Sequence, residues 1–292
     1  PRACSACRAL PAFRVAARSV YFINRHHLFL SNPLGAFVGY VLLGLGISIS
    51  LYALFNACRI KIKKITIQNK KIKHPLHIAH LSDLHLGPIH KYAYLERIVK
   101  KVNELKADHV MITGDLIDGP GKLPDDLLED LNKIKVPIYY SVGNHELYIG
   151  IDHASRLIKN TKAHFLDNEM MHTKDMTVLG IEHSEDNGIL AKKLPAFSID
   201  KNKFNVLLYH APENLEDACK AGIDLMLSGH THAGQIFPFN FLVKLRFRRI
   251  YGLFEHNGTF LHITSGSGTW GPPMRLGSDC EITHIEIVPS EK

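Results

Sequence analysis

The chain has 292 residues, of which 46% are hydrophobic and 22% are charged, values that are ordinary for a globular protein and exclude general disorder. The net charge of +7 is unevenly placed, since residues 1–74 contain twelve Lys and Arg and no Asp or Glu. This leaves 23 basic and all 28 acidic residues for 75–292, a net charge of −5. The division argues against nucleic acid as a partner and favours contact of the basic part with anionic lipid head groups.

Residues 34–57 form a run without a charged residue, rich in Leu, Ile, Val and Gly. About 20 apolar residues are enough to cross a hydrocarbon core of about 30 Å as a helix. A signal sequence is an alternative, but the run is long for one and no A-x-A cleavage site follows. A buried core helix is another, although four basic residues lie within positions 59–64. We therefore expect a transmembrane helix over 34–58, after an N-terminal tail over 1–33 that is disordered or non-native.

The basic residues also predict an orientation. Residues 59–73 carry seven Lys or Arg, whereas five are spread over the first 33 residues. The positive-inside rule then places the later flank, and the domain that follows it, in the cytoplasm. We expect a single-pass membrane protein in which 59–74 is a basic juxtamembrane linker and 75–292 is one domain that carries the chemistry.

Strand-like and helix-like segments alternate from residue 76 onward. Strands are expected at 76–81, 110–113, 137–142, 177–181, 204–209, 223–227, 259–264 and 281–288, and helices at 92–106, 125–133 and 212–220. Such alternation predicts layered α/β packing with helices covering sheets. Residues 241–249 alternate between apolar and mostly basic side chains, which predicts an edge strand with one solvated face.

Five short polar motifs follow these strands, and each offers carboxylate, imidazole or amide groups. In chain order they are Asp83-x-His85, Gly114-Asp115-x-x-Asp118, Gly143-Asn144-His145-Glu146, His210 and Gly229-His230-Thr231-His232. Ligands gather at the carboxyl ends of strands in open α/β sheets, and these groups suit zinc, manganese and iron. One Asp-x-His would mean little among 19 histidines, but chance does not explain five such groups at strand ends. The glycines before them allow tight turns and close approach.

This series resembles the calcineurin-like metallophosphoesterase superfamily, whose signature motifs would all lie within residues 80–232. Segments 229–236 and 265–275 resemble a bacterial membrane-anchored subgroup, with Ala233 in place of the usual glycine. That departure matters only if the position requires positive φ. The resemblance implies an α/β (α+β) fold of four layers, a β-sandwich of mixed sheets flanked by helices.

The resemblance also implies a site with two divalent metal ions, taken from Mn, Zn, Fe or Mg with Mn favoured. One ion would be held by Asp83, His85 and His232, the other by Asn144, His210 and His230, and both by Asp115. Such a pair polarises phosphate oxygens and activates water. His145 would act as the catalytic residue that stabilises the transition state or protonates the leaving oxygen. Asp118 and Glu146 would orient imidazoles through their N–H groups.

Two arginines are candidates for substrate binding. Arg275 is suited to bidentate phosphate binding, and Arg246 belongs to the basic and apolar segment 241–249, which would form a rim for an amphiphilic substrate at the membrane.

The expected activity is that of a membrane-anchored phosphoesterase or pyrophosphatase. The subgroup implies a lipid-linked nucleotide such as UDP-diacylglucosamine as substrate, with other small phosphate esters also possible. A nuclease or cyclic-nucleotide phosphodiesterase would use the same metals, although the acidic domain disfavours long nucleic acids. A non-catalytic scaffold on this fold is the third alternative, and the filled ligand positions disfavour it. Nothing in the sequence indicates an oligomeric state.

Overall fold

The computed structural model describes residues 33–119 and 123–290. The tail expected over 1–33 therefore lies outside the described residues, except for Pro33, which begins a helix. The chain divides after Tyr52 into two units, and each is described by itself.

Helix α2, Pro33–Ala57, lies within one residue of the segment predicted to span a membrane. It is long and apolar enough to cross a bilayer, and its most apolar stretch is not buried against protein. The hydroxyls of Ser48 and Ser50 donate to the carbonyls of Gly44 and Gly46, both at 2.8 Å, so these polar groups are satisfied within the helix. The last turn, from Ala53, belongs to the second unit.

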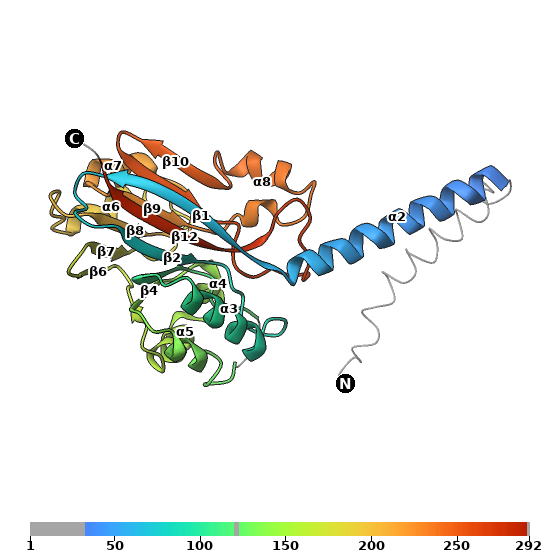
Figure 1. Ribbon diagram of the computed structural model, residues 1–292, viewed down its shortest axis with the longest axis horizontal. Helices are drawn as coiled ribbons and strands as arrows, with labels where there is room; N and C mark the ends of the chain where they lie inside the picture. Colours follow the sequence, from blue (N-terminus) through green and yellow to red (C-terminus); the bar gives the residue numbers. More distant parts are fainter. Residues whose placement is uncertain (1–32, 120–122, 291–292) are drawn as a thin grey trace, which may run out of the picture. The chain divides into compact units, whose positions relative to one another are not determined.

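The second unit is built on two six-stranded sheets (Figure 1). The first has the order β1 (Ile60–Asn69), β12 (Cys280–Pro289), β2 (Leu76–Leu81), β3 (His109–Thr113), β4 (Ile138–Ser141) and β5 (His164–Phe165). The second has the order β10 (Gly252–His256), β11 (Thr259–Ile263), β9 (Leu225–Ser228), β8 (Asn205–Leu208), β7 (Thr177–Gly180) and β6 (Glu169–His172). Strands β2 to β5 are mutually parallel, as are β7, β8, β9 and β11.

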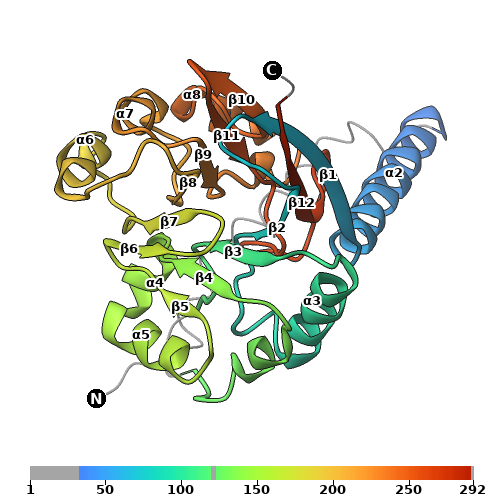
Figure 2. The ribbon, with the colours of Figure 1, turned by 60° about the vertical axis from the view of Figure 1, so that its left-hand side comes forward.

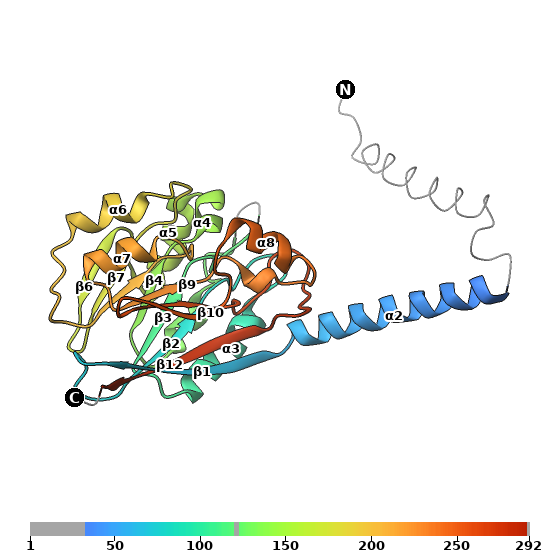
Figure 3. The same ribbon diagram turned by 90° about the horizontal axis from the view of Figure 1, so that it is seen from above.

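Helices cover the outer face of each sheet (Figures 2 and 3). They are α3 (Tyr92–Glu104), α4 (Asn144–Ile149) and α5 (Ile151–Lys159) on the first sheet, and α6 (Ile189–Lys193) and α7 (Leu215–Ala221) on the second, with α8 (Asn240–Arg246) beyond β9 in the chain. Three apolar cores separate the layers. One joins α3 and α5 to the first sheet, one lies between the sheets, and one joins α6 and α7 to the second sheet. The four-layer α/β prediction is confirmed.

The prediction of a linker over 59–74 is wrong, and the domain begins earlier than residue 75. Strand β1 pairs in parallel with β12 from Ile60 to Asn69, and Ile60 and Ile67 are buried. The cause is visible in Ile-Lys-Ile-Lys-Lys-Ile-Thr-Ile, where isoleucines alternate with polar residues as in a strand with one solvated face. The lysines that suggested a linker lie largely on the exposed face.

Two further elements differ from prediction. Residues 125–133 form turns followed by the 3₁₀ helix η2, Glu129–Lys133, instead of an α-helix. Residues 241–249 do not form an edge strand, because 240–246 is helix α8. None of the α8 residues is buried. The helix therefore has no apolar face packed against the domain, and its sequence lacks the 3.6-residue spacing of apolar residues that would have predicted a helix.

Candidate metal centre

The five polar motifs meet at one edge of the paired sheets. Motifs one to three follow the carboxyl ends of β2, β3 and β4 in the first sheet, and His210 and His230 follow β8 and β9 in the second. Parallel strands bring their carboxyl ends to one edge. Residues up to 149 positions apart in the chain therefore converge, since Asp83 and His232 lie 3.3 Å apart (Oδ1 to Nε2).

Two clusters made only of expected ligands share this edge, beside a third group formed by His85, Asp118 and His145. Asp83, His85 and His232 form one, and Asp115, His210 and His230 form the other, with the ligand atoms of each within 4.8 Å of one another. The Oδ2 atom of Asp115 lies 3.2 Å from His210 Nε2 and 3.8 Å from His85 Nε2. Asp115 thus stands between the clusters, as expected for a carboxylate that bridges two ions.

The remaining expected ligand, Asn144, also fits a metal site. It begins α4, it is buried, and its Oδ1 has no hydrogen-bond partner among the described residues. The next residue donates its backbone N–H to Asp115 Oδ1 at 2.9 Å, which places Asn144 beside the clusters. A buried oxygen without a partner is costly unless a ligand completes it. Carboxylate, imidazole and amide donors together suit two divalent cations.

Imidazole orientation is set by backbone contacts. His210 Nδ1 donates to the Thr113 carbonyl at 2.6 Å, which leaves its Nε2 to face the clusters. Burial disfavours the charged ring, but the carboxylates of Asp115 and Asp83 raise the pKa of His210 to about 10. Burial and the positive charge of His210 lower the pKa of His230 to about 3. The carboxylates of Asp115 and Asp83 therefore favour the charged form of the His210 imidazole.

The chain reaches these positions through backbone conformations that non-glycine residues rarely adopt. Asp83, His85, Asp115, His230 and His232 all have φ between 48° and 69°. Such residues occur where the surrounding structure holds the strain, commonly at functional sites. At Gly143 and Gly229 a Cβ would overlap the carboxylates of Asp115 and Asp83, which explains these two glycines by close approach.

Ala233 is an exception to the glycine pattern with a measurable consequence. Its φ is 52°, so the position does require the left-handed conformation that glycine adopts freely. We expect Ala233→Gly to raise the free energy of unfolding by up to about 1 kcal/mol, the relief of left-handed strain exceeding the loss of chain entropy. Chemical denaturation measures this change, and a destabilised variant would contradict it.

His145 and Asp118 form a pair at the edge of the clusters. His145 Nδ1 lies 2.7 Å from Asp118 Oδ1, and His85 Nδ1 lies 3.3 Å from Asp118 Oδ2. Asp118 therefore lies against two imidazoles, and its role in orienting them stays a prediction. Burial opposes the charged form of His145, but its hydrogen bond to Asp118 and the charge of Asp115 outweigh burial and raise the pKa of His145.

Glu146 does not orient an imidazole, so that prediction is wrong. Its fully buried carboxylate accepts backbone N–H groups of Gly143, Asp115, Leu116 and Ile117, at 2.7 to 3.1 Å. The reason is its place in the first turn of α4, where a carboxylate points back towards free amides. Glu146 thus holds the loop that carries Asp115 against the loop that carries Asn144.

The prediction that Arg275 binds substrate phosphate is also wrong. The side chain is fully buried, and its Nη atoms donate to the carbonyls of His232 and Gly268 at 2.9 and 2.6 Å. Its Nη2 also lies 3.2 Å from His232 Nδ1. Arg275 therefore positions the metal-site residue His232, and no donor is turned outward. Arg246 is exposed on α8 and pairs with Glu213 at 2.5 Å, so its role with substrate stays a prediction.

His183 is a site residue that the sequence reading missed. It follows β7, it is buried, and its ring centroid lies 5.3 Å from that of His230 and 5.6 Å from that of His210. Its Nδ1 has no hydrogen-bond partner. The signal was available, because a strand was expected at 177–181 and His183 follows it by two positions, as Asp83, Asp115 and Asn144 follow their expected strands.

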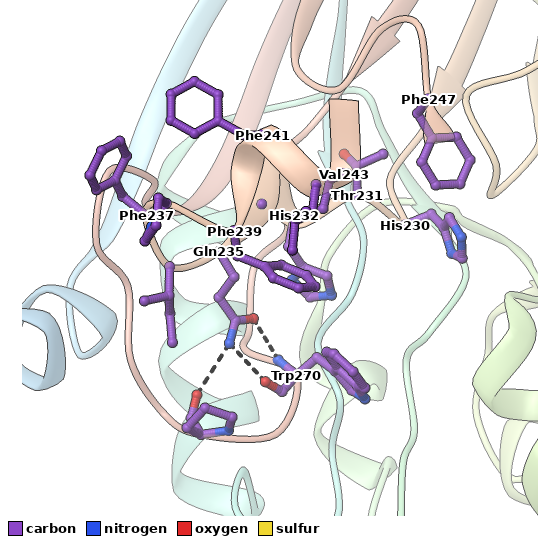
Figure 4. Close-up of a pocket in the computed structure, with 15 residues that line it drawn as sticks. His230, Thr231, His232, Gln235, Phe237, Phe239, Phe241, Val243, Phe247 and Trp270 are labelled. Atoms are coloured by element: carbon purple, nitrogen blue, oxygen red, sulfur yellow. Dashed lines mark hydrogen bonds between the residues drawn. The ribbon is translucent and has the colours of Figure 1, made fainter. Parts of the chain in front are cut away.

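An apolar cavity of about 760 Å³ opens beside the clusters of ligand atoms (Figure 4). His230 and His232 form part of its wall, and Phe237, Phe239 and Trp270 line it with other apolar side chains. Gln235 fixes the loop of Trp270, donating from Nε2 to its carbonyl at 2.7 Å and accepting its N–H at 2.9 Å. The cavity offers a binding surface for an apolar group next to the clusters.

Proteins similar to this chain were found by sequence and by structure. A protein from Helicobacter pylori described as an uncharacterized metallophosphoesterase is 35% identical over 247 residues, covering 80% of this chain and 65% of that protein. A Danio rerio "transmembrane protein with metallophosphoesterase domain" is 33% identical over 82% of this chain and 60% of its own length. The chain thus spans less than two thirds of these relatives. A dimetal phosphatase structure from Danio rerio aligns with a TM-score of 0.42 at 12% identity, covering 74% of this chain and 99% of that one.

The family comparison covers the whole of the metal centre. The profile described as calcineurin-like phosphoesterase matches residues 76–234, from the start of β2 to just beyond His232. All seven expected ligands fall within that range, and it takes in more than half of the chain. The chain therefore belongs to the calcineurin-like phosphoesterase family.

Proposed function

We propose that the protein is a membrane-anchored phosphoesterase that holds two divalent metal ions and hydrolyses a phosphoester or pyrophosphate bond. The observation that carries this proposal is the convergence of two ligand clusters on Asp115. Asp83, His85 and His232 would hold one ion, and Asn144, His210 and His230 the other. Two such ions polarise the phosphoryl group and activate water for in-line displacement. The imidazoles of the donor set suit a transition ion, and its carboxylate and amide oxygens suit manganese, which is our first choice.

Proton delivery would fall to His145. Its Nδ1 is occupied by Asp118, which leaves Nε2 towards the clusters, 4.0 Å from Asp115 Oδ2. The raised pKa of His145 favours the protonated ring at neutral pH. His145 Nε2 would then give its proton to the leaving oxygen, while Asp118 holds the ring in orientation.

The membrane anchor would be α2, with the domain that follows it on the cytoplasmic side. Helix α2 meets the length and polarity requirements of a span, and basic residues follow it. The Danio rerio relative is named a transmembrane protein, which supports the same assignment.

We propose further that the substrate carries an apolar group, as in a lipid-linked nucleotide such as UDP-diacylglucosamine. The support is the apolar cavity whose wall includes His230 and His232, because a substrate phosphate at these histidines would have apolar contacts beside it. Burying one chain methylene contributes about 0.8 kcal/mol, so an acyl chain in this cavity would add substantial affinity.

Activity against a panel of substrates tests the proposed function. The whole chain, purified in detergent and loaded with Mn²⁺, would be assayed on a phosphomonoester, a phosphodiester, a cyclic nucleotide, DNA and a nucleotide–lipid anhydride. We expect the highest kcat/KM on the anhydride. A preference for DNA or the cyclic nucleotide would favour the nuclease or cyclic phosphodiesterase alternative. Stoichiometric metal without hydrolysis of any substrate would favour a scaffold.

Substitution in the cavity tests the substrate class. We expect Phe239→Ala to lower kcat/KM on the lipid-linked substrate by roughly 10-fold, because burial of a Phe side chain contributes about 1.5–3 kcal/mol. Hydrolysis of a small chromogenic ester should change little. Leu253→Ala, at an exposed position of β10 that does not line the cavity, is the control. Equal losses on both substrates would show that the cavity does not select the apolar group.

A further inference from the structure

Segment 237–245, the loop that leads into α8 together with most of that helix, exposes an unusual number of large apolar side chains. Phe237, Phe239, Phe241, Leu242 and Leu245 are 50% to 85% exposed. Elsewhere in the described chain beyond Ala57, exposed large apolar residues occur singly or in pairs. A soluble surface rarely keeps such a group uncovered, which indicates a partner.

The charges around this segment indicate what the partner is. Residues 237–249 contain Lys244, Arg246, Arg248 and Arg249 and no acidic residue. Within the part of the chain that the structure describes, Arg246 alone of these four has an acidic partner, Glu213. Exposed Phe and Leu beside Lys and Arg are typical of a segment that lies in the interface of a bilayer, where apolar groups enter and cations meet anionic head groups.

The fold ties this segment to the end of α2. The backbone N–H of Arg275 donates to the Ala53 carbonyl at 2.9 Å, and Asn56 Nδ2 donates to the Ser278 carbonyl at 2.9 Å. On its other side the same strip of chain pairs with the start of segment 237–245, since the N–H of Phe237 donates to the Leu276 carbonyl at 2.8 Å. One strip, 275–278, therefore separates the last turn of α2 from the exposed phenylalanines.

The length of α2 fixes where the membrane surface falls along the chain. A helix needs about 20 residues to cross the hydrocarbon core, so a span that begins near Pro33 ends near Tyr52. Ala53 and Asn56 then lie at the interface by chain connectivity alone. Segment 237–245 is held next to these residues by the contacts of strip 275–278.

We infer that segment 237–245 is a membrane-docking surface, which inserts its Phe and Leu side chains into the same bilayer that α2 crosses. Because Phe237, Phe239 and Phe241 also line the apolar cavity, docking would set the mouth of the cavity at the lipid surface (Figure 4). The inference rests on the membrane anchoring proposed above, and it does not depend on catalysis.

Quenching of tryptophan fluorescence by brominated lipid tests the docking surface. Trp270 is the only tryptophan, so Trp270→Phe provides a silent background in the whole chain. Leu245→Trp and Phe241→Trp would report on the segment in nanodiscs made with or without lipids brominated near the head group. Lys159→Trp is the control, on an exposed site of α5, which lies apart from α8 (Figures 1 and 2).

We expect bromine to remove about half or more of the emission of both reporters, since interfacial side chains enter about 5–10 Å, and little of the control emission. Quenching of both reporters no greater than that of Lys159→Trp, in chain retained by the discs, would overturn docking and leave anchoring intact. Shielding from aqueous acrylamide without quenching by bromine would assign the face to another protein and overturn it as well. Chain that does not stay with the discs would refute anchoring and docking together.

Discussion

Replacing Asp115 with Asn is expected to lower kcat/KM by roughly 10³-fold, because the carboxylate between the two clusters loses its charge. Asp115 Oδ2 is 3.2 Å from His210 and 3.8 Å from His85, so both clusters depend on it. Cation catalysis contributes several kcal/mol, and each 1.36 kcal/mol changes the rate tenfold. The Asn side chain keeps an oxygen that can accept the backbone N–H of His145, so the fold should persist.

Metal content separates this effect from misfolding. Elemental analysis of Asp115→Asn should show fewer bound ions per chain, with an unchanged circular dichroism spectrum. Asp152→Asn, at an exposed position in the first turn of α5, removes the same charge away from the clusters and should leave activity intact. Full activity and full metal content in Asp115→Asn would refute a bridging carboxylate.

His145→Gln is expected to lower turnover by roughly 10²–10⁴-fold on esters with poor leaving groups, the usual range for loss of a general acid. A nitrophenyl ester needs little proton assistance and should lose far less. The metal content should stay constant, since His145 is not among the expected ligands. Similar losses on alkyl and nitrophenyl esters would instead assign His145 a structural role, and His153→Gln on α5 is the matched control.

The pH profile gives an independent reading of the same residue. Asp118 and Asp115 raise the pKa of His145 above its usual value, against the effect of burial. A general acid works in its protonated form, so activity should fall as pH rises through that raised pKa. Asp118→Asn replaces the charged acceptor of the Nδ1–H with a neutral amide oxygen and should move this falling limb to lower pH. An unmoved limb would show that another group delivers the proton.

The sequence predicted correctly those features that produce a recognisable local pattern of residues. Each polar motif follows a buried apolar strand, and parallel strands bring their carboxyl ends to one edge of a sheet, so a common site could be predicted from the motifs. The grouping of Asp83 with His232 came instead from the family resemblance. The layered packing could also be predicted from the sequence, because α3 carries apolar residues on one face only, as expected for a helix that covers a sheet.

Other features of the structure have no recognisable pattern in the sequence. Whether Arg275 faces solvent or the protein interior depends on carbonyls of His232 and Gly268 that only the folded loops bring near it. The carboxylate of Glu146 serves backbone amides, which are the same for every sequence and carry no motif. Strand β1 pairs with β12, which lies 220 positions later in the chain, and the lysines of β1 led to the prediction of a basic juxtamembrane linker. Helix α8 has no buried residue, so packing did not require helical spacing of its apolar residues, and they alternate with mostly polar ones as in a strand.

The junction after α2 has a consequence for how this protein could be released from a membrane. Only Cys58 and Arg59 separate the helix from β1, and Ala53, Asn56 and Ala57 are buried within the domain. Asn56 donates to the carbonyl of Arg275, whose side chain holds His232. Proteolytic shedding at this junction would therefore take away interior packing two contacts from a metal-site histidine. Anchor and enzyme would be lost together, and a freely diffusing active form would not arise by such a cut.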